Sequence, residues 1–273
     1  MQPDLSSLFR QPGGILEEIA LHKLTEVNQA RAAVPVTRLE ESEVFDRSCY
    51  SMKQFMLAAG RTGIIAEFKR SSPSKGVIND SADVATVTKA YADAGASALS
   101  VLTDQKFFGG RIRDLIEARQ VNEVPVLRKE FILDEYQIIE AKAIGADIVL
   151  LIAALLKPAT VKRFASLAKS LGLNVLLEVH NLEELEESLC DDLDAVGVNN
   201  RNLVDFSVSL DHSYSLVDKI PPEFLKISES GISNPETILD LKKAGFNGFL
   251  VGENFMREAD PGEAMLNFVK QLS

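Results

Sequence analysis

Hydrophobic and polar positions follow two different patterns along this chain. Up to about Gly60, apolar residues recur at helical spacing among charged ones. One such series ends at Pro35 and comprises Ile15, Leu16, Ile19 and Val27. A second series, over residues 44–57, predicts another helix that stops at Gly60. We therefore expect residues 1–60 to form a helical N-terminal extension.

From residue 61 onward, short apolar runs alternate with amphipathic segments. The runs predict strands at 64–68, 98–102, 124–129, 148–152, 174–178, 195–198, 225–228 and 248–251. The segments between and after them predict helices at 83–94, 111–120, 134–144, 158–171, 182–189, 210–219, 235–244 and 261–272. Several of these helices end in Gly, as at Gly95 and Gly245, which is a common C-terminal signal. Runs that are apolar throughout indicate a parallel sheet buried on both faces.

Eight successive βα units predict an α/β fold of the (β/α)8 TIM barrel type over residues 61–273, forming one domain with the extension. The alternative is a doubly wound open sheet. That fold is disfavoured because no GxGxxG turn follows the first strand, and because one sheet would have to hold eight parallel strands. In a barrel, the functional side chains are expected where the strands end.

The composition of the chain excludes several classes of function. Lys and Arg number 29 against 40 Asp and Glu, a net charge of −11, which argues against nucleic-acid and anionic-membrane partners. The longest apolar run, 148–156, is too short for a bilayer, which needs about 20 residues. Cys49 and Cys190 lie far apart with no His ligands nearby, so they predict neither a disulfide framework nor a zinc site. Free thiols fit a cytoplasmic location.

Charged and polar side chains cluster where the predicted strands end. Glu67 and Lys69 lie two residues apart and so point to the same side. Later strand ends contribute Lys129, Glu178, Asn199, Arg201, Glu229 and Glu253. Any one pair is explained equally well by an ion pair, but the whole set at one end favours a site. At the strand starts we expect few charges, with Lys226 the main one.

The last two strand ends have the pattern of a phosphate site. Ser230-Gly231 follows the seventh predicted strand and Gly252-Glu253 follows the eighth, before a short helical segment at 254–257. Glycines let the backbone approach an anion, and N–H groups at a helix start can hold it. A turn explains either glycine alone, whereas the pairing favours a phosphate ester as ligand.

Other features leave two interpretations open. The polar loop 70–76 is either solvated or a lid over the ligand. Phe107, Phe108 and Phe131 lie in loops, either as buried anchors or against an apolar part of a substrate. Only His180 of the three histidines is near the strand ends, and no metal-binding set or Ser-His-Asp set is predicted. Acid–base chemistry would therefore fall to Lys and Glu.

Seven sequence blocks resemble the indole-3-glycerol phosphate synthase family of tryptophan biosynthesis. They are IAEFKRSSPS (65–74), SVLTD with FFGG (100–110), PVLRKEFI (125–132), LEVH (177–180), GVNNRNL (197–203), SESGI (228–232) and VGE (251–253). The resemblance covers nearly the whole chain, including ILEEI at 15–19. Glu130 stands where Asp is commoner, and Glu253 stands where some members have Ser.

The resemblance implies a carboxy-lyase without a cofactor or metal. It would close the ring of 1-(2-carboxyphenylamino)-1-deoxyribulose 5-phosphate, release CO2 and eliminate water to give indole-3-glycerol phosphate. Lys129 would be the general acid on the ketone oxygen and would hold the carboxylate, and Glu178 would be the general base. Lys69 would serve the dehydration or bind the substrate and its phosphate, and Glu67 would hold Lys69 or the sugar hydroxyls.

The resemblance also implies the remaining contacts to substrate. Asn199, in the catalytic set, would act with Arg201 and Glu229 to position the substrate and the lysines. Phosphate would be held at Ser230, Gly231, Gly252 and Glu253. The anthranilate ring would pack on Pro73, Phe108 and Phe131, with Ser72 beside it. We expect a monomer acting on this small molecule, which leaves room for transient contact with other enzymes of the pathway.

Other functions stay open at this point. A phosphoribosylanthranilate isomerase would need a Cys/Asp pair at the strand ends, but the first strand here ends in Lys69. A ribulose-phosphate epimerase would need His and Asp around a metal. A non-catalytic barrel relative would have lost Lys129 or Glu178, and both are present. From the length of 273 residues we expect no fusion with the isomerase.

Overall fold

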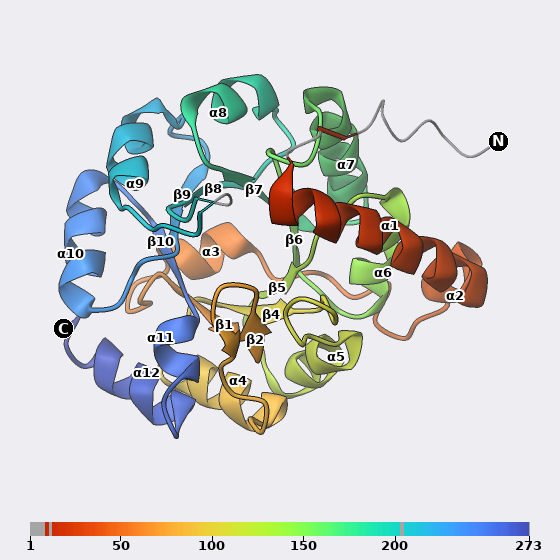
Figure 1. The fold of residues 1–273 in the computed structure, drawn as a ribbon. Coiled ribbons are helices and arrows are strands. Elements are labelled where there is room, and N and C mark those ends of the chain that lie inside the picture. Colours follow the sequence, from red (N-terminus) through yellow and green to blue (C-terminus); the bar gives the residue numbers. More distant parts are fainter. Residues whose placement is uncertain (1–8, 11–12, 203–204, 273) are drawn as a thin grey trace.

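The computed structural model describes residues 9–10, 13–202 and 205–272. Within them, parallel strands close into a barrel in which each strand pairs with the next along the chain and the last pairs with the first (Figure 1). The strands are β1 (Ile64–Phe68), β4 (Ala98–Leu102), β5 (Val126–Lys129), β6 (Ile148–Ile152), β7 (Asn174–Val179), β8 (Ala195–Asn199), β9 (Leu225–Glu229) and β10 (Gly248–Val251). The predicted barrel is confirmed, and the strand bounds agree to within two residues.

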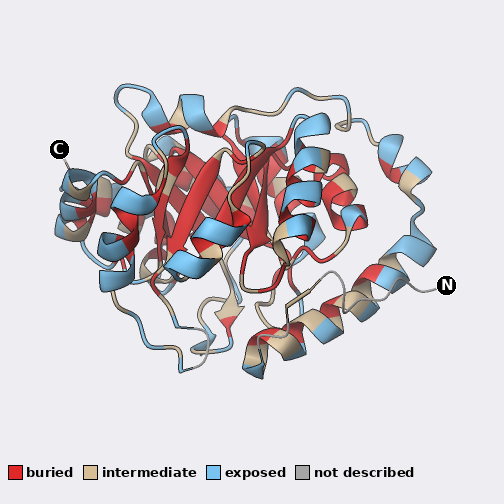
Figure 2. Ribbon diagram, turned by 90° about the horizontal axis from the view of Figure 1, so that it is seen from above, coloured by how far each residue is buried: buried red, intermediate tan, exposed pale blue. Residues whose placement is uncertain are grey.

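Helices surround the barrel and turn their apolar faces inward. They are α4 (Val84–Asp93), α5 (Ile112–Val121), α6 (Glu135–Ala143), α7 (Pro158–Ser170), α8 (Leu182–Ser188), α9 (Asp211–Leu216), α10 (Pro235–Ala244), α11 (Glu253–Met256) and α12 (Pro261–Val269). Figure 2 shows the buried strands at the centre and exposed residues on the outer sides of the helices. Side-chain caps start several helices, as Asp83 does by accepting from the Thr86 N–H. Gly245 ends α10 at φ 109°, as its sequence position predicts.

The N-terminal extension forms a long helix and two short ones: α1 (Gly14–Ala33), α2 (Val36–Glu40) and α3 (Met52–Leu57). In Figure 1, α1 lies in front of one side of the barrel and runs past α6 toward α2. The helix predicted over 44–57 is wrong in its first half, because α3 begins only at Met52, after the Ser51 cap. The preceding residues are held outside a helix by tertiary hydrogen bonds. The Tyr50 N–H and the Arg47 guanidinium both donate to Asp147, at 2.8 and 2.7 Å.

The predicted polar loop after β1 contains a small antiparallel hairpin. Its strands are β2 (Ser71–Ser72) and β3 (Gly76–Val77). The Arg70 guanidinium forms an ion pair with Asp114 of α5, which ties the base of the hairpin to the barrel wall. No helix within the described ranges is both long and apolar enough to cross a membrane.

Buried charges also lie at the starts of the strands, where we expected few. Asp147 immediately precedes β6 and is fully buried. It accepts hydrogen bonds from Arg47 and Arg119 and from two backbone N–H groups. The sequence did not reveal this cluster because its members come from separate segments, with Arg47 100 residues and Arg119 28 residues from Asp147.

Candidate active site

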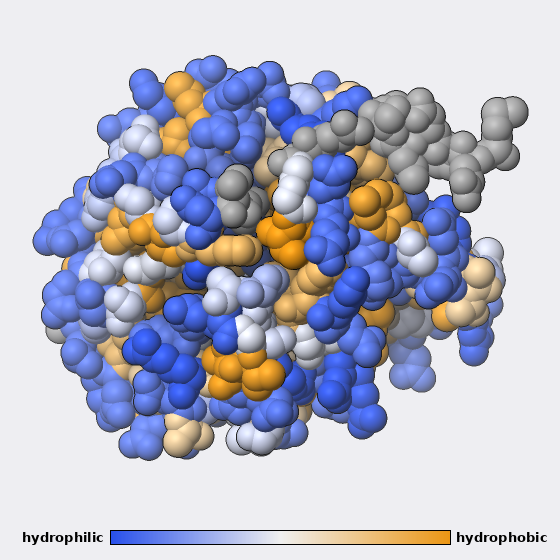
Figure 3. All heavy atoms as spheres, viewed as in Figure 1, coloured by the Kyte–Doolittle hydropathy of each residue, from blue (hydrophilic) through white to orange (hydrophobic). Residues whose placement is uncertain are grey.

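A cavity opens at the C-terminal ends of the strands. It is lined by the predicted residues Glu67, Lys69, Ser72, Pro73, Phe108, Lys129, Phe131, Glu178, Asn199, Arg201, Glu229 and Ser230. The other three predicted residues, Gly231, Gly252 and Glu253, line an adjoining cavity that shares Arg201 and Ser230 with the first. Figure 3 shows this face of the molecule, with apolar side chains gathered near its middle and hydrophilic ones toward the margin.

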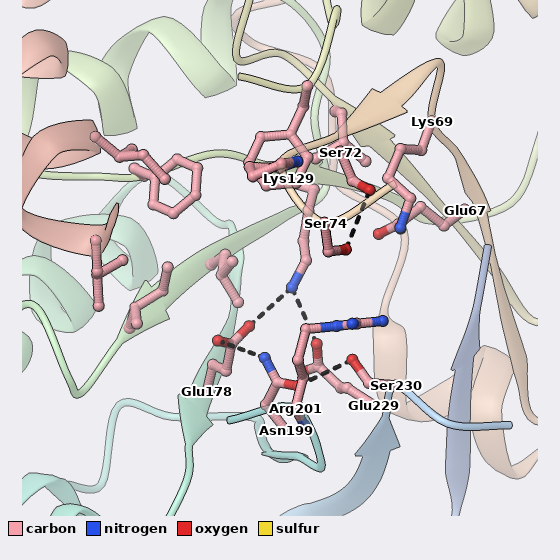
Figure 4. A pocket seen from close by; sticks show the side chains of 18 of the residues that line it. Glu67, Lys69, Ser72, Ser74, Lys129, Glu178, Asn199, Arg201, Glu229 and Ser230 are labelled. Carbon is pink, nitrogen blue, oxygen red and sulfur yellow. Dashed lines mark hydrogen bonds and ion pairs between the residues drawn. The ribbon is translucent and has the colours of Figure 1, made fainter. Parts of the chain in front are cut away.

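The Lys129 ammonium lies at the centre of the polar residues. It is 2.8 Å from Glu178 Oε2 and 3.0 Å from Glu229 Oε2 (Figure 4). The three side chains come from β5, β7 and β9, which are alternate strands of the barrel. Inward side chains of alternate strands share one layer, so the barrel itself brings these groups together.

Two carboxylates share this one ammonium, and their protonation differs. Burial alone would lower the pKa of Lys129, but the two carboxylates outweigh burial and raise it above its ordinary value. Burial raises the pKa of Glu178, yet the Lys129 charge and other neighbours bring it down to about 2. The pKa of Glu229 is raised to about 7, by burial and by the Glu178 charge against the opposing effect of Lys129. The arrangement keeps Lys129 and Glu178 ionised, while Glu229 can hold a proton near neutral pH.

Asn199 orients the carboxylate of Glu178 from β8. Its Nδ2 donates to Glu178 Oε1 at 3.1 Å, and its Oδ1 accepts from the Ser230 hydroxyl at 2.9 Å. The Arg201 N–H also donates to Asn199 Oδ1, at 3.0 Å. Ser230 has φ 66°, a conformation that is uncommon for a residue other than glycine and is often found at functional sites.

The second lysine, Lys69, pairs with Glu67 as the strand alternation predicts. Lys69 Nζ is 3.0 Å from Glu67 Oε1, and Ser100 donates to Glu67 Oε2 at 3.2 Å. Two glycines make room for the carboxylates of the site. A Cβ on Gly252 would lie 2.8 Å from the Glu67 side chain, and one on Gly197 would lie 2.1 Å from Glu229 Oε1. The sequence did not predict this role of Gly197, because a glycine within a strand has other common explanations, such as a bulge or a bend.

The cavity also has an apolar side and a phosphate-loop side. The Phe108 and Phe131 rings pack 5.8 Å apart between centroids, and both line the cavity beside Leu150 and Ile152. At the adjoining cavity, the Glu253 carboxylate lies 3.7 Å from both Arg201 Nη2 and Lys75 Nζ. A flat, apolar ligand part fits the first region, and an anionic ligand part fits the glycine loops and cations of the second.

A family model decides the family. The model described as indole-3-glycerol phosphate synthase matches residues 16–268. The chain belongs to the indole-3-glycerol phosphate synthase family. Its relatives include proteins of that name from Bacteroides thetaiotaomicron, 47% identical over 94% of this chain and 98% of the relative, and from Laribacter hongkongensis, 46% identical over 92% and 97%.

Solved structures with much lower identity share the barrel. A tryptophan synthase complex from Pyrococcus furiosus matches with a TM-score of 0.57 at 18% identity, over 77% of this chain and 97% of that one. A thiamine phosphate pyrophosphorylase from the same organism has a TM-score of 0.55 at 19% identity, over 77% and 95%. At these identities the likeness concerns the fold alone.

In this member of the family, the N-terminal helix α1 contributes directly to the cavity, which the sequence had not predicted. Leu16 and Ile19 line the cavity, and the next residue on the same face is Lys23. Lys23 is buried and lies 2.9 Å from Asp104 and 3.1 Å from Glu130, next to Lys129 in sequence. The available signal was one lysine in the apolar stripe of α1, because such a charge needs buried partners.

Proposed function

We propose that this chain catalyses the reaction of its family, the conversion of 1-(2-carboxyphenylamino)-1-deoxyribulose 5-phosphate to indole-3-glycerol phosphate. The observation that carries the proposal is the Lys129 ammonium held between Glu178 and Glu229, in a cavity with an aromatic side and a glycine-loop side. Such a cavity matches a substrate with a benzene ring, a carboxylate and a phosphate.

Substrate binding would use the two sides of the cavity. The anthranilate ring would pack on Phe108, Phe131 and Pro73, with Ser72 beside it. The phosphate would lie at the loops after β9 and β10, against the backbone of Ser230, Gly231, Gly252 and Glu253. Lys69 and Arg201 would supply positive charge there, although the whole chain carries −11. A small anion responds to the local potential more than to the net charge.

Ring closure would use Lys129 as the general acid. The ring carbon that bears the carboxylate attacks the ribulose ketone carbon, and Lys129 gives its proton to the ketone oxygen. The ring is then an iminium, so it takes up the electron pair of the bond to the carboxylate as CO2 leaves. The substrate itself thus accepts the electrons. Lys129 is held 2.8 and 3.0 Å from two carboxylates, which fixes its ammonium in the cavity.

Dehydration would use the other acid and the base. The hydroxyl formed from the ketone leaves as water with a proton from Lys69, which pairs with Glu67. Glu178 takes a proton from the carbon that is bonded both to the nitrogen and to the carbon carrying the hydroxyl. This step completes the indole. Glu178 contacts Lys129 at 2.8 Å, so the proton that it takes can return to Lys129 for the next turnover. Lys69, whose side chain is 15% exposed, takes its proton back from solvent, because release of the carboxylate as CO2 consumes one proton per turnover. Asn199 holds Glu178 in place, and Glu229 holds Lys129.

The test is direct turnover of the anilino-deoxyribulose phosphate by the purified protein. The chain has no Trp, so indole fluorescence reports product over a low background. We expect product from the wild type and competition by inorganic phosphate. No indole fluorescence from a folded protein would refute the activity, and product formation without phosphate competition would refute the phosphate assignment.

A further inference from the structure

A half-buried histidine lies directly behind the proposed base. His180 follows β7, two residues after Glu178, and its Nε2 is 3.6 Å from Glu178 Oε1. Its side chain is 14% exposed, and it is not among the residues that line the cavity. Nε2 is buried and has no hydrogen-bond partner among the described residues. This titratable group lies close to Glu178, yet the proposed reaction gives it no step.

The other side of the imidazole is anchored by α8. His180 Nδ1 lies 3.2 Å from Glu184 Oε2, and the same oxygen accepts from the His180 backbone N–H at 2.8 Å. Asn181 caps α8 and also donates to Glu184 Oε1 at 3.0 Å. The Glu184 carboxylate is therefore fixed, and it fixes the imidazole between two carboxylates.

The proposed site needs a group that makes its two carboxylates unequal. Glu178 and Glu229 each contact Lys129, at 2.8 and 3.0 Å, and two buried carboxylates around one ammonium tend to share a proton. A proton on Glu178 would disable the base, whereas a proton on Glu229 would not. Asn199 Nδ2 and His180 both approach Glu178 Oε1, while Glu229 Oε1 has no partner among the described residues.

We propose that His180, held by Glu184, is a positioning residue that carries a positive charge behind Glu178 and so directs the shared proton to Glu229. The proposal rests on the proposed function, in which Glu178 is the base. The charged groups facing Glu178 are Lys129 of β5, Glu229 of β9 and His180, and those facing His180 are Glu178, Glu184 and, farther away, Glu229. Burial lowers the pKa of His180, but the hydrogen bond to Glu184 and the Glu178 charge outweigh burial and raise it.

The first test is the pH profile of kcat/KM for His180→Gln. Without this cation, the proton that the two carboxylates take up near pH 7 should lie partly on Glu178, so the acid limb should move up toward pH 7 by at least about one pH unit, with most of the activity recovered at higher pH. Glu184→Gln should shift the limb less, in the same direction. His212→Gln, the same change on the exposed start of α9, is the matched control and should not shift it. An equal loss at every pH in His180→Gln would overturn the proposal, since a merely structural role predicts that result.

Two further measurements separate this proposal from the assignment of the base. Histidine NMR titration needs no turnover, and the chain has three histidines to assign. We expect His180 to titrate above the ordinary histidine pKa, and lower in Glu184→Gln; an unshifted or depressed pKa would refute the charge. In a Glu178→Gln background, His180→Gln should have no further effect on turnover, whereas an undiminished effect would show that His180 acts elsewhere. Wild-type turnover in Glu178→Gln alone would instead refute Glu178 as the base.

Discussion

The two ends of the barrel both bury charged side chains, but they do so in different surroundings. At the N-terminal end, Asp147 Oδ1 accepts from Arg47 at 2.7 Å and from the Tyr50 N–H at 2.8 Å. Asp147 Oδ2 accepts from Arg119 at 2.8 Å and from the Val126 N–H at 2.9 Å. Both carboxylate oxygens are satisfied, and the bonds join the extension, α5, β5 and β6; two guanidinium nitrogens, Arg47 Nε and Arg119 Nη2, are buried with no hydrogen-bond partner among the described residues. This cluster holds the fold together.

At the C-terminal end, one ammonium serves two carboxylates, and it is a carboxylate oxygen that lacks a partner. Lys129 contacts Glu178 and Glu229, while Glu229 Oε1 is buried with no hydrogen-bond partner among the described residues. Such an arrangement costs stability, and it keeps Lys129 protonated and Glu178 deprotonated, the forms from which a general acid and a general base start. The difference therefore separates charges that stabilise the structure from charges that we propose serve the reaction.

Lys129→Ala should break the function of the C-terminal cluster most completely. The variant loses both the proposed acid and the group that holds the substrate carboxylate, so we expect kcat/KM to fall about 1,000-fold, within the range of general acid catalysis. Steady-state fluorescence kinetics would measure the loss, and circular dichroism would confirm the fold. Activity within tenfold of the wild type would place the acid elsewhere.

Glu178→Gln should lower kcat about 100-fold or more, because the amide cannot take the proton that completes the indole. KM should change far less, since the amide keeps the shape of the side chain. Glu184→Gln is a matched control, because it is the same change at a residue that contacts His180 instead of Lys129. Its loss of kcat at pH 8 should be much smaller. Equal losses in both variants would contradict a base role for Glu178.

The sequence predicted the C-terminal end better than the N-terminal end, for a physical reason. Strand alternation and the barrel rule place Glu67, Lys69, Lys129 and Glu178 at one rim without knowledge of their partners. The resemblance to the family then supplied roles for them. The cluster around Asp147 has no such local rule, because its donors come from a turn in the extension and from α5.

The N-terminal extension shows the same limit of prediction from sequence. Its first helix was predictable from apolar periodicity, but its placement over the cavity depends on Lys23 finding Asp104 and Glu130, about 80 and 107 residues away in sequence. The wrong half of the helix predicted over 44–57 has the same cause. Arg47 and Tyr50 meet a buried carboxylate that lies a hundred residues later in the chain.

Asp147→Asn should weaken the fold and leave the chemistry intact, which is the converse of the lysine variant. The amide cannot accept on both sides from two guanidinium groups and two N–H groups, so the buried Arg119 and the half-buried Arg47 lose their counterion. We expect the free energy of unfolding to fall by about 3 kcal/mol, a hundredfold change in the unfolding equilibrium. Urea unfolding would measure it, and kcat of the folded variant should stay near the wild-type value. A large loss of kcat at unchanged stability would contradict the view that the charges at the N-terminal end of the barrel stabilise the fold only.

Glu229→Gln should stabilise the protein at high pH while impairing turnover. The folded-state pKa of Glu229 is raised to about 7, so the folded protein binds this proton more tightly than the unfolded chain does. The wild type therefore loses stability as pH rises from about 4.5 to 7, and the variant does not. We expect a gain of about 3 kcal/mol at pH 8 that shrinks as pH falls below 7 and vanishes near pH 4.5. Destabilisation at pH 8 would show that the carboxylate contributes to the fold.

Glu253→Gln removes a negative charge at the phosphate-loop side of the cavity. Of the five substitutions, we expect this one to have the smallest effect. The Glu253 carboxylate is 33% exposed and lies 3.7 Å from both Arg201 and Lys75, where it competes with an incoming phosphate for these cations. A partly exposed charge in this position is worth about 0.5 kcal/mol, so inorganic phosphate should inhibit the variant about two- to threefold more strongly, and less so at high salt. Glu258→Gln, on the exposed segment after α11, is the control. Weaker inhibition in Glu253→Gln would mean that the carboxylate organises Arg201 and Lys75 for phosphate, so that the charges at this side of the rim resemble those around Asp147.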